Sequence, residues 1–276
     1  MVMASLLRDP GIDDFDIIAI QEPWRNPYSA TTHHPAQDRF HLCYPTGDAE
    51  GQARVCFFIN KRIDQTKWRF EGRTRDICSI IINIDPTDDQ QSREQLIVHN
   101  VYNPPKTSNN RQSALPQVRE ALRHYQTNEQ LLLGDFNLHH PLWGGLNREV
   151  TDPESEDLID IIGDFALHNT LPPGTVTYEE GRSQSTIDLC LVTTGLIEQV
   201  IKSEVDRSLD HDSDHLPIST TLDLTVQCLE KKPRKDWKRL NEKRYTRALT
   251  RSLPPLRRPL TKAALDSYTA EVTAAI

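Results

Sequence analysis

The sequence predicts an α/β sandwich in which two sheets are flanked by helices. Short apolar runs rich in Ile and Val recur along the first 224 residues, and several are apolar on both faces. Such runs are typical of strands in covered sheets. Two segments with helical periodicity separate groups of these strands. Helices placed between strand groups favour a layered α/β architecture over an all-β one.

The individual elements follow from these patterns. Strands are expected at residues 15–20, 54–60, 77–84, 95–103, 130–136, 186–192 and 216–224, where apolar runs are bounded by turn residues. Helices are expected at residues 113–127 and 155–169, where apolar residues recur with a period near 3.6.

Charge divides the chain into two segments. Residues 229–276 hold 13 Lys and Arg against 5 Asp and Glu, while the rest of the chain holds 19 against 35. Prolines near residues 233 and 254 support a boundary soon after residue 225. We therefore predict a main domain at residues 1–227 and a basic, helical linker at residues 228–276.

Targeting and redox signals are consistent with an intracellular protein. The sequence contains no run of 18 apolar residues, so no transmembrane helix is expected. The N-terminus does not have the pattern of a signal peptide. The five cysteines occur singly: Cys43, Cys56, Cys78, Cys190 and Cys228. Their scattered spacing favours buried, reduced thiols over a disulfide framework or a zinc site.

Polar residues gather where five of the expected strands end or begin. They are Glu22; Tyr102 and Asn103; Asp135 and Asn137; Asp188; and Asp214 with His215. Ligands of α/β sheets bind where strand ends and their loops converge, so these clusters are expected to line one site.

The residue types in these clusters indicate a particular chemistry. Carboxylate and amide oxygens suit Mg²⁺ (or Mn²⁺) with retained waters better than zinc. A histidine beside an aspartate can accept a proton from water, with its tautomer fixed by the carboxylate. Together they would support metal-assisted attack of water on a phosphodiester.

Five motifs in order, "IQEPW", "VYNPP", "GDFNLHHPLWGG", "STIDL" and "SDHLPI", resemble the endonuclease/exonuclease/phosphatase superfamily. The "DFNLHHPLWGG" stretch is similar to the apurinic-endonuclease-like domains of LINE-type (non-LTR) retrotransposons. The resemblance implies a four-layer α/β/β/α sandwich with two mixed sheets. It also implies a nick in DNA that leaves a 3′-hydroxyl, from which a reverse transcriptase domain of the full-length element primes.

The resemblance also implies a role for each residue. Glu22 would bind the divalent metal, helped by Asp214, and Tyr102 would contact the scissile phosphate. Asp135 would orient or deprotonate the attacking water, and His215, supported by Asp188, would act as base or stabilise the transition state. Further positions would face the phosphate or DNA: Asn103, Asn137, Thr177, Ser213, Arg25, Arg148 and Arg182.

One feature departs from the family pattern. The family begins with a strand that ends in an Asn ahead of the Glu motif, whereas no Asn precedes Asn26 in this sequence. The residues before Glu22 read as the helix that follows such a strand. We therefore expect the first strand to be missing and the chain to be truncated at both ends, which puts full activity in doubt. The family's role places such a protein in the nucleus.

Other interpretations of these residues remain open. Asp135 and Asn137 could form an Asx-turn that closes a strand, and His139 and His140 are expected to be structural or to face DNA. Trp143 is expected to pack, and the loop of Asp210, His211 and Asp212 to be solvent-exposed. The basic segment could contact phosphates or be a solvated linker.

Two alternative functions also remain. The protein could be a phosphatase of the same fold, acting on phosphoinositides or sphingomyelin, although the "HHPLWGG" stretch argues against this. It could instead be a catalytically impaired fragment that only binds DNA or partners.

Overall fold

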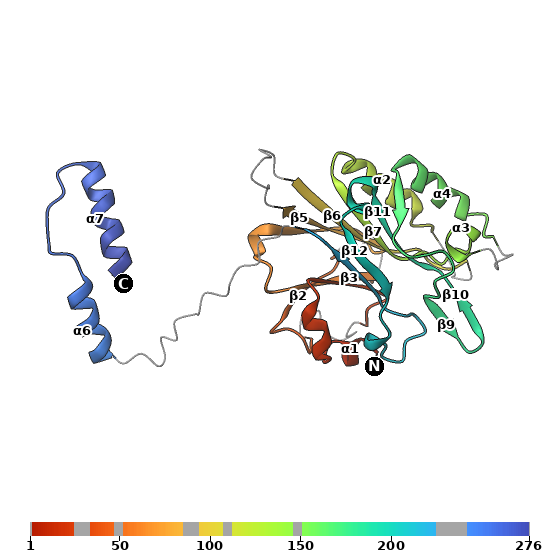
Figure 1. Ribbon diagram of the computed structural model, residues 1–276, viewed down its shortest axis with the longest axis horizontal. Helices are drawn as coiled ribbons and strands as arrows, with labels where there is room; N and C mark the ends of the chain where they lie inside the picture. Colours follow the sequence, from red (N-terminus) through yellow and green to blue (C-terminus); the bar gives the residue numbers. More distant parts are fainter. Residues whose placement is uncertain are drawn as a thin grey trace. The chain divides into compact units, whose positions relative to one another are not determined.

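The computed structural model describes residues 2–24, 34–46, 52–84, 94–106, 112–145, 151–224 and 242–275. The chain divides into two compact units, Met1–Leu229 and Glu230–Ile276 (Figure 1). The second unit contains two helices, α6 (Glu242–Ser252) and α7 (Lys262–Ala275).

A six-stranded sheet forms the centre of the first unit. Its order is β4-β5-β6-β7-β11-β8. The strands are β4 (Trp68–Thr74), β5 (Ile77–Ile84), β6 (Glu94–Tyr102), β7 (Glu129–Asp135), β11 (Asp188–Thr193) and β8 (Leu167–Asn169). β6 and β7 are parallel and the other neighbours are antiparallel, so the sheet is mixed.

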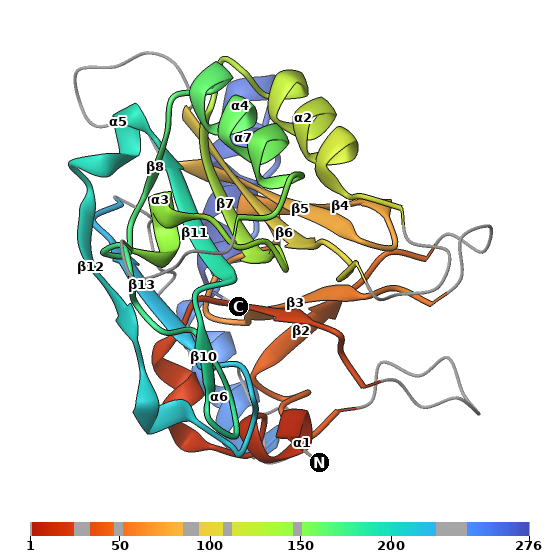
Figure 2. The same cartoon turned by 90° about the vertical axis from the view of Figure 1, so that its right-hand side faces the viewer.

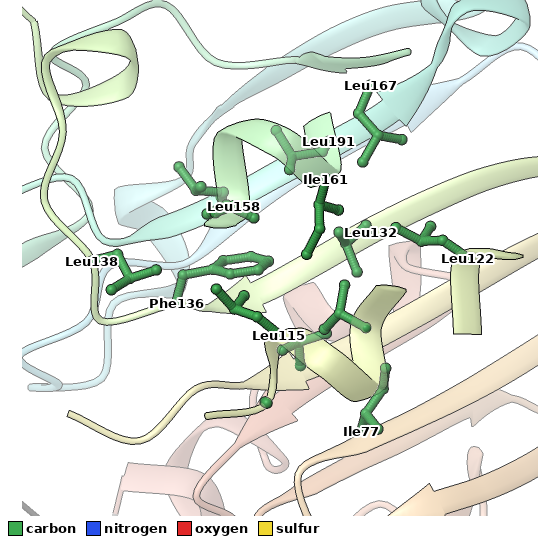
Figure 3. Packing of buried hydrophobic residues seen from close by; sticks show 14 of the residues in the cluster. Ile77, Leu115, Leu122, Leu132, Phe136, Leu138, Leu158, Ile161, Leu167 and Leu191 are labelled. Carbon is green, nitrogen blue, oxygen red and sulfur yellow. The ribbon is translucent and has the colours of Figure 1, made fainter. Parts of the chain in front are cut away.

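Two helices cover one face of this sheet (Figure 2). They are α2 (Leu115–His124) and α4 (Ser155–Asp164), and each carries an apolar stripe against the strands. The cluster between helices and sheet includes Leu122, Leu132, Phe136, Leu158, Ile161 and Leu191 (Figure 3). This packing fixes β7 and β11, which carry Asp135 and Asp188 at one end.

A second layer of strands covers the other face. It consists of a three-stranded group ordered β1-β3-β2, and a separate antiparallel pair, β12 and β13. The strands are β1 (Ile17–Gln21), β2 (Phe40–Cys43), β3 (Val55–Asn60), β12 (Val200–Val205) and β13 (Ile218–Leu222). Apolar residues of both groups pack on the same core cluster as β5, β6 and β11.

The fourth layer lies outside the β1-β3-β2 group. α1 (Val2–Leu6) and the 3₁₀ helix η1 (Pro10–Asp14) place apolar residues against β2 and β3. Short elements complete the unit: η2 (Gln65–Lys67), α3 (Pro141–Gly144), the β9 (Tyr178–Glu180) and β10 (Ser183–Ser185) hairpin, α5 (Thr194–Ile197) and η3 (Arg207–Leu209).

The predicted α/β sandwich is confirmed, although several elements differ, among them β2, β4 and β12, which were not predicted. The second layer contains only antiparallel pairs among the described strands, so it is not mixed. The helix predicted at residues 155–169 is too long, because α4 ends at Asp164 and Leu167–Asn169 form β8. Ala166 has a φ of 48° at the turn between them, which a helix does not allow.

The residues before β1 are helical, as the sequence predicted. Helical segments α1 and η1 come first, and β1, which leads into Glu22, is the first strand within the described ranges. Cys56, Cys78 and Cys190 are buried free thiols and Cys43 is half-buried; Cys228 lies outside the described residues. Among the helices described, none is both long and apolar enough to cross a membrane.

Candidate active site

Three of the predicted residues lie side by side on one rung of the central sheet. Tyr102 pairs with Asp135 across β6 and β7, and Asp135 pairs with Asp188 across β7 and β11. Because side chains alternate along a strand, all three share the face that carries Val98 and Cys190 toward the second layer. The strand pairing thus brings together residues that are up to 86 positions apart in the sequence.

Gly134 allows this close approach of strands. Its φ is 146°, and a Cβ atom there would lie 1.9 Å from the carbonyl oxygen of Val101. Asp135 follows at once and is fixed by Asn137, whose backbone N–H donates to Oδ1 (3.0 Å) and whose amide donates to Oδ2 (2.7 Å). The apolar run before Asp135 therefore ends in a carboxylate with a defined orientation.

His215 completes the cluster from the loop before β13. Its Nδ1 lies 3.0 Å from both carboxylate oxygens of Asp188, and its Nε2 lies 3.9 Å from Oδ2 of Asp135. Tyr178 packs edge-on against the imidazole, with ring centroids 4.9 Å apart. The His215 side chain is 34% exposed, whereas those of Asp135 and Asp188 are 5% and 10% exposed. The imidazole therefore lies between the buried carboxylates and solvent.

The electrostatics of this cluster are strongly coupled. Burial and the charge of Asp188 raise the pKa of Asp135 to about 7, against the opposing effects of His215 and Asn137. Burial by itself lowers the pKa of His215, but the hydrogen bond and charge of Asp188 outweigh it. With added contributions from Asp135 and Asp214, they raise the pKa of His215 to about 9. Near neutral pH the imidazole is therefore protonated, and Asp135 is poised to exchange a proton.

Glu22 and Tyr102 form the other half of the site. Burial and the hydrogen bond with Glu22 raise the pKa of the Tyr102 phenol, with a further contribution from the charge of Asp135. Tyr102 therefore stays protonated and lies within the electrostatic reach of both carboxylates. Glu22 has a φ of 48° at the end of β1, and its N–H donates to the Arg54 carbonyl (2.7 Å).

Several residues of the site have side chains of a type that can bind a divalent cation. Asp135, Asp188 and His215 offer ligand atoms within 4.8 Å of one another. The Nδ1 of His215 is already engaged by Asp188, so this trio is better suited to proton transfer. Glu22 and the exposed Asp214 offer carboxylate oxygens, which Mg²⁺ prefers. The negative charge that raises the pKa of Asp135 also favours a cation close by.

Two predicted phosphate contacts have a different role in the structure. The Asn103 side chain is fully buried; it donates to the Phe136 carbonyl (2.9 Å) and accepts from the Ala114 N–H (2.9 Å). Thr177 is also fully buried, and its hydroxyl accepts from the N–H of Asp188 (3.1 Å). Direct phosphate contact by either residue was a wrong prediction, because neither side chain reaches the surface.

Asn137 needs a similar correction. Its amide nitrogen donates to Asp135 Oδ2 (2.7 Å) and to the Asn103 carbonyl (3.1 Å). Both amide hydrogens are therefore used within the protein, and the predicted phosphate-holding role gives way to one of orienting Asp135. Its φ of 50° is a left-handed backbone conformation that these hydrogen bonds stabilise.

The remaining predicted residues lie around the rim or outside the described ranges. Ser213 accepts the N–H of His215 (3.2 Å), and the Asp214 carbonyl accepts the N–H of Glu179 (2.8 Å), so both shape the histidine loop. Arg182 is exposed in the β9–β10 hairpin. Arg25 and Arg148, which were predicted to face the phosphate or DNA, lie outside the described residues.

Histidines near the site have structural contacts. His139 lies 3.1 Å from Asp152, and His140 caps α3 by accepting the N–H of Leu142 (3.0 Å). His211 was expected to be solvent-exposed, and this was wrong. Its side chain is 16% exposed, with Nδ1 3.0 Å from the Ser5 hydroxyl and Nε2 3.1 Å from Asp9. It therefore ties the loop of His215 to α1 and η1.

An open groove lies beside α3 and the end of β10. Its volume is about 1120 Å³, and its lining comes from α3, from residues 173–176 and from the end of β10. Leu142, one of the lining residues, is 52% exposed. Thr186, another lining residue, stands two positions before Asp188 in the sequence.

Sequence reasoning missed three residues that support the site. Tyr178 packs on His215, while Arg54 and Asp76 form an ion pair behind Tyr102. Tyr178 stands directly after Thr177, so its position offered a signal. Arg54 and Asp76 lie outside every motif, and only the pairing of distant strands brings them to the site.

Known proteins match the chain at both the sequence and the structural level. A family model described as "Endonuclease-reverse transcriptase" matches residues 96–219. The endonuclease domain of TRAS1, a telomere-specific non-LTR retrotransposon, is similar with 18% identity and a TM-score of 0.60. That likeness covers 81% of this chain and 93% of that domain. The comparison with curated proteins found no match.

Two further solved structures show the same likeness. An AP endonuclease from Leishmania major is 13% identical with a TM-score of 0.61, over 79% of this chain and 82% of that one. The catalytic domain of Xenopus laevis APE2 is 15% identical with a TM-score of 0.57, over 84% of this chain and 90% of that one.

The comparisons confirm the predicted resemblance. The first unit is an α/β sandwich domain similar to the apurinic-endonuclease-like branch of the endonuclease/exonuclease/phosphatase superfamily. The matched residues 96–219 include Tyr102, Asp135, Asp188 and His215, but not Glu22. The part of the site on the central sheet therefore lies in the region that the family model recognises.

Proposed function

We propose that the protein hydrolyses a phosphodiester bond in DNA with Mg²⁺ or Mn²⁺, producing a nick with a 3′-hydroxyl. The main support is His215, held 3.0 Å from Asp188 and 3.9 Å from Asp135 at the exposed end of the sheet. Such a nick would prime a reverse transcriptase of the same element, in keeping with the description of the matching family. Residues 228–276 would lead toward that domain, and a DNA target would place the activity in the nucleus.

Residues of this chain can carry out each step of the phosphodiester hydrolysis. Tyr102, kept protonated by its raised pKa, shifts its single O–H hydrogen bond from Glu22 to a non-bridging phosphate oxygen when substrate binds. Asp135 accepts a proton from the attacking water, whose oxygen forms a bond to phosphorus as the bond to the 3′ oxygen breaks. The departing 3′ oxygen takes up a proton from solvent and becomes the hydroxyl. Protonated His215 stabilises the negative charge that grows on phosphorus-bound oxygens.

A cation would be held by Glu22 and Asp214. When bound, Mg²⁺ there supplies Lewis-acid stabilisation of charge on the phosphate. Glu22 is fixed for this purpose by its contacts with Tyr102 and Arg54.

Nicking of supercoiled plasmid tests the proposal. The full chain is expected to convert supercoiled to open circles with Mg²⁺ and to stop when EDTA is added. Asp135→Ala and His215→Ala are expected to lose activity by about 10²–10⁴-fold. His168→Ala, an exposed histidine on β8, is the matched control and should retain it. Extension of the nick by a DNA polymerase with labelled nucleotides identifies the 3′-hydroxyl. A folded parent chain without activity would overturn hydrolysis and favour the DNA-binding alternative.

A further inference from the structure

Four residues form a closed ring of contacts behind the site. The Glu22 N–H donates to the Arg54 carbonyl (2.7 Å), and the Tyr102 N–H donates to the Asp76 carbonyl (2.9 Å). The Arg54 guanidinium pairs with the Asp76 carboxylate through Nε and through Nη2, the latter at 2.6 Å. The Tyr102 phenol closes the ring by its hydrogen bond with Glu22.

The ion pair in this ring is largely buried and geometrically specific. The side chains of Arg54 and Asp76 are 19% and 14% exposed. A two-point contact between guanidinium and carboxylate fixes the orientation of both planes. The same guanidinium lies 4.8 Å from the centre of the Tyr102 ring, so Arg54 restrains that ring as well.

The ring joins the two strand layers at the end where the site lies. Arg54 directly precedes β3 in the second layer, and Asp76 directly precedes β5 in the central sheet. Glu22, at the end of β1, adopts a left-handed φ of 48° that costs free energy unless its surroundings stabilise it. The hydrogen bond from its N–H to Arg54 provides that stabilisation.

We propose that Arg54 and Asp76 are positioning residues that set the placement of Glu22 relative to Tyr102, and hence the affinity of the site for a divalent cation. The inference rests on the proposed function, in which Glu22 is a metal ligand. Neither residue contacts the reacting atoms. Their effect is transmitted by the carbonyl groups that hold Glu22 and Tyr102 and by the stacked guanidinium.

A second arginine provides a matched control. Arg73 on β4 lies 2.9 Å from Glu71 and 5.4 Å from the centre of the Tyr125 ring, and Tyr125 donates a hydrogen bond to Glu71. Its side chain is 16% exposed, close to the value for Arg54. The two arginines therefore have the same type of environment, but Arg73 contacts none of the site residues named above.

The test measures binding of Mn²⁺ alone to the full chain by calorimetric titration, and plasmid nicking in parallel. Arg54→Met and Asp76→Asn are each expected to weaken Mn²⁺ binding by about tenfold or more, as supporting residues of metal ligands do. Arg73→Met should leave the affinity unchanged. Circular dichroism checks that each variant is folded. If Arg54→Met does not fold, the double variant Arg54→Met with Asp76→Asn replaces it, since this leaves no buried charge unpaired.

The outcomes separate positioning from simple charge effects. A charge effect alone would strengthen cation binding in Arg54→Met and weaken it in Asp76→Asn, whereas positioning weakens both. Opposite changes, or unchanged affinity in both variants, would overturn the inference, and so would a parent chain that does not bind Mn²⁺. A parent that binds Mn²⁺ but does not nick DNA contradicts the proposed function, while the Mn²⁺ affinities still decide the positioning role.

Discussion

Two histidines of this domain have similar contact distances and opposite electrostatic properties. His99 on β6 is fully buried between the Ser79 hydroxyl (2.8 Å) and the Gln130 amide oxygen (3.0 Å). His215 lies 3.0 Å from the Asp188 carboxylate and remains one-third exposed. Burial lowers the pKa of His99 to about 4, whereas the carboxylates raise that of His215 to about 9.

The difference shows that the charge of the neighbouring group decides the state of an imidazole. Neutral partners satisfy the hydrogen bonds of His99 without stabilising a proton, so burial dominates and the residue acts as a polar core side chain. A carboxylate partner reverses the direction of the pKa shift at His215, so this imidazole is a charged group at the surface of the site.

Gly134→Ala should have the largest effect, because both histidines depend on the approach of β6 and β7. A methyl group there would overlap the Val101 carbonyl, and the glycine φ of 146° is unfavourable for alanine. We expect a loss of more than about 4 kcal/mol in the free energy of unfolding, measured by urea denaturation. Gly163→Ala on α4 is the control, since no atom lies within 4 Å of the added methyl. It should stabilise by about 0.5–1 kcal/mol; equal effects of the two variants would contradict the prediction.

Asp188→Asn should give His215 a neutral partner like those of His99. The parent nicking rate should rise as Asp135 loses its proton near pH 7 and fall as His215 loses its proton near pH 9. In the variant both pKa values fall, because Asp188 raises both, and the optimum moves to lower pH. The rate at pH 7.5 should fall by about 10²-fold or more.

The pH profile distinguishes this from a simple structural defect. A variant that loses activity while keeping the parent's optimum would show that Asp188 does not control the proton on His215. Urea denaturation of Asp188→Asn at pH 7.5 is the control for folding, and the variant should unfold at the same urea concentration as the parent.

His99 should destabilise the protein in acid. Its folded pKa of about 4 lies below the unfolded value of 6.5, so the unfolded state binds the proton first as pH falls. This group should therefore remove about 3 kcal/mol of stability between pH 6.5 and pH 4, and contribute nothing above pH 6.5. Nuclear magnetic resonance can follow its imidazole directly, with the exposed His168 as internal control. Titration of His99 near pH 6.5 would refute its neutral, buried state.

His211→Ala should give the smallest effect of the four. It removes the contacts with Ser5 and Asp9 that hold the His215 loop against α1 and η1. We expect a decrease of about 1 kcal/mol in the free energy of unfolding and a loss of nicking of tenfold or less. Asp210→Ala, at the exposed neighbour, is the control. A loss as large as that of Asp188→Asn would mean that the loop contact matters more than the charge on His215.

The central strands could be predicted because burial on both faces produces continuous apolar runs, as in β5 and β7. β4 was missed because its side chains are only partly buried and its sequence mixes charged and aromatic residues. The helix ending at Asp164 was predicted too long because Phe165 and Leu167 continue its apolar spacing. Their placement depends on the pairing of Leu167 with Thr193, which local sequence does not contain.

The site also contains some features that the local sequence predicts and others that depend on the packed structure. Motifs identified Tyr102, Asp135, Asp188 and His215, whose chemistry follows from residue type and strand-end position. The roles of Asn103 and Thr177 were mistaken because a polar side chain beside a site can face either the substrate or the backbone beneath it. Only the packed structure decides between these directions.

Residues with a left-handed backbone conformation lie beside the site residues in the sequence. Of the four non-glycine residues with positive φ in the described parts of the chain, three are Glu22, Asn137 and Asp212. Each stands beside a residue with a proposed role or has one itself, and glycine would adopt such a φ at a lower backbone cost. The protein thus accepts backbone strain at positions whose side chains or neighbours belong to the site. A laboratory selection for heat resistance alone should replace these residues with glycine first. The selected protein should be more thermally stable but should nick DNA poorly.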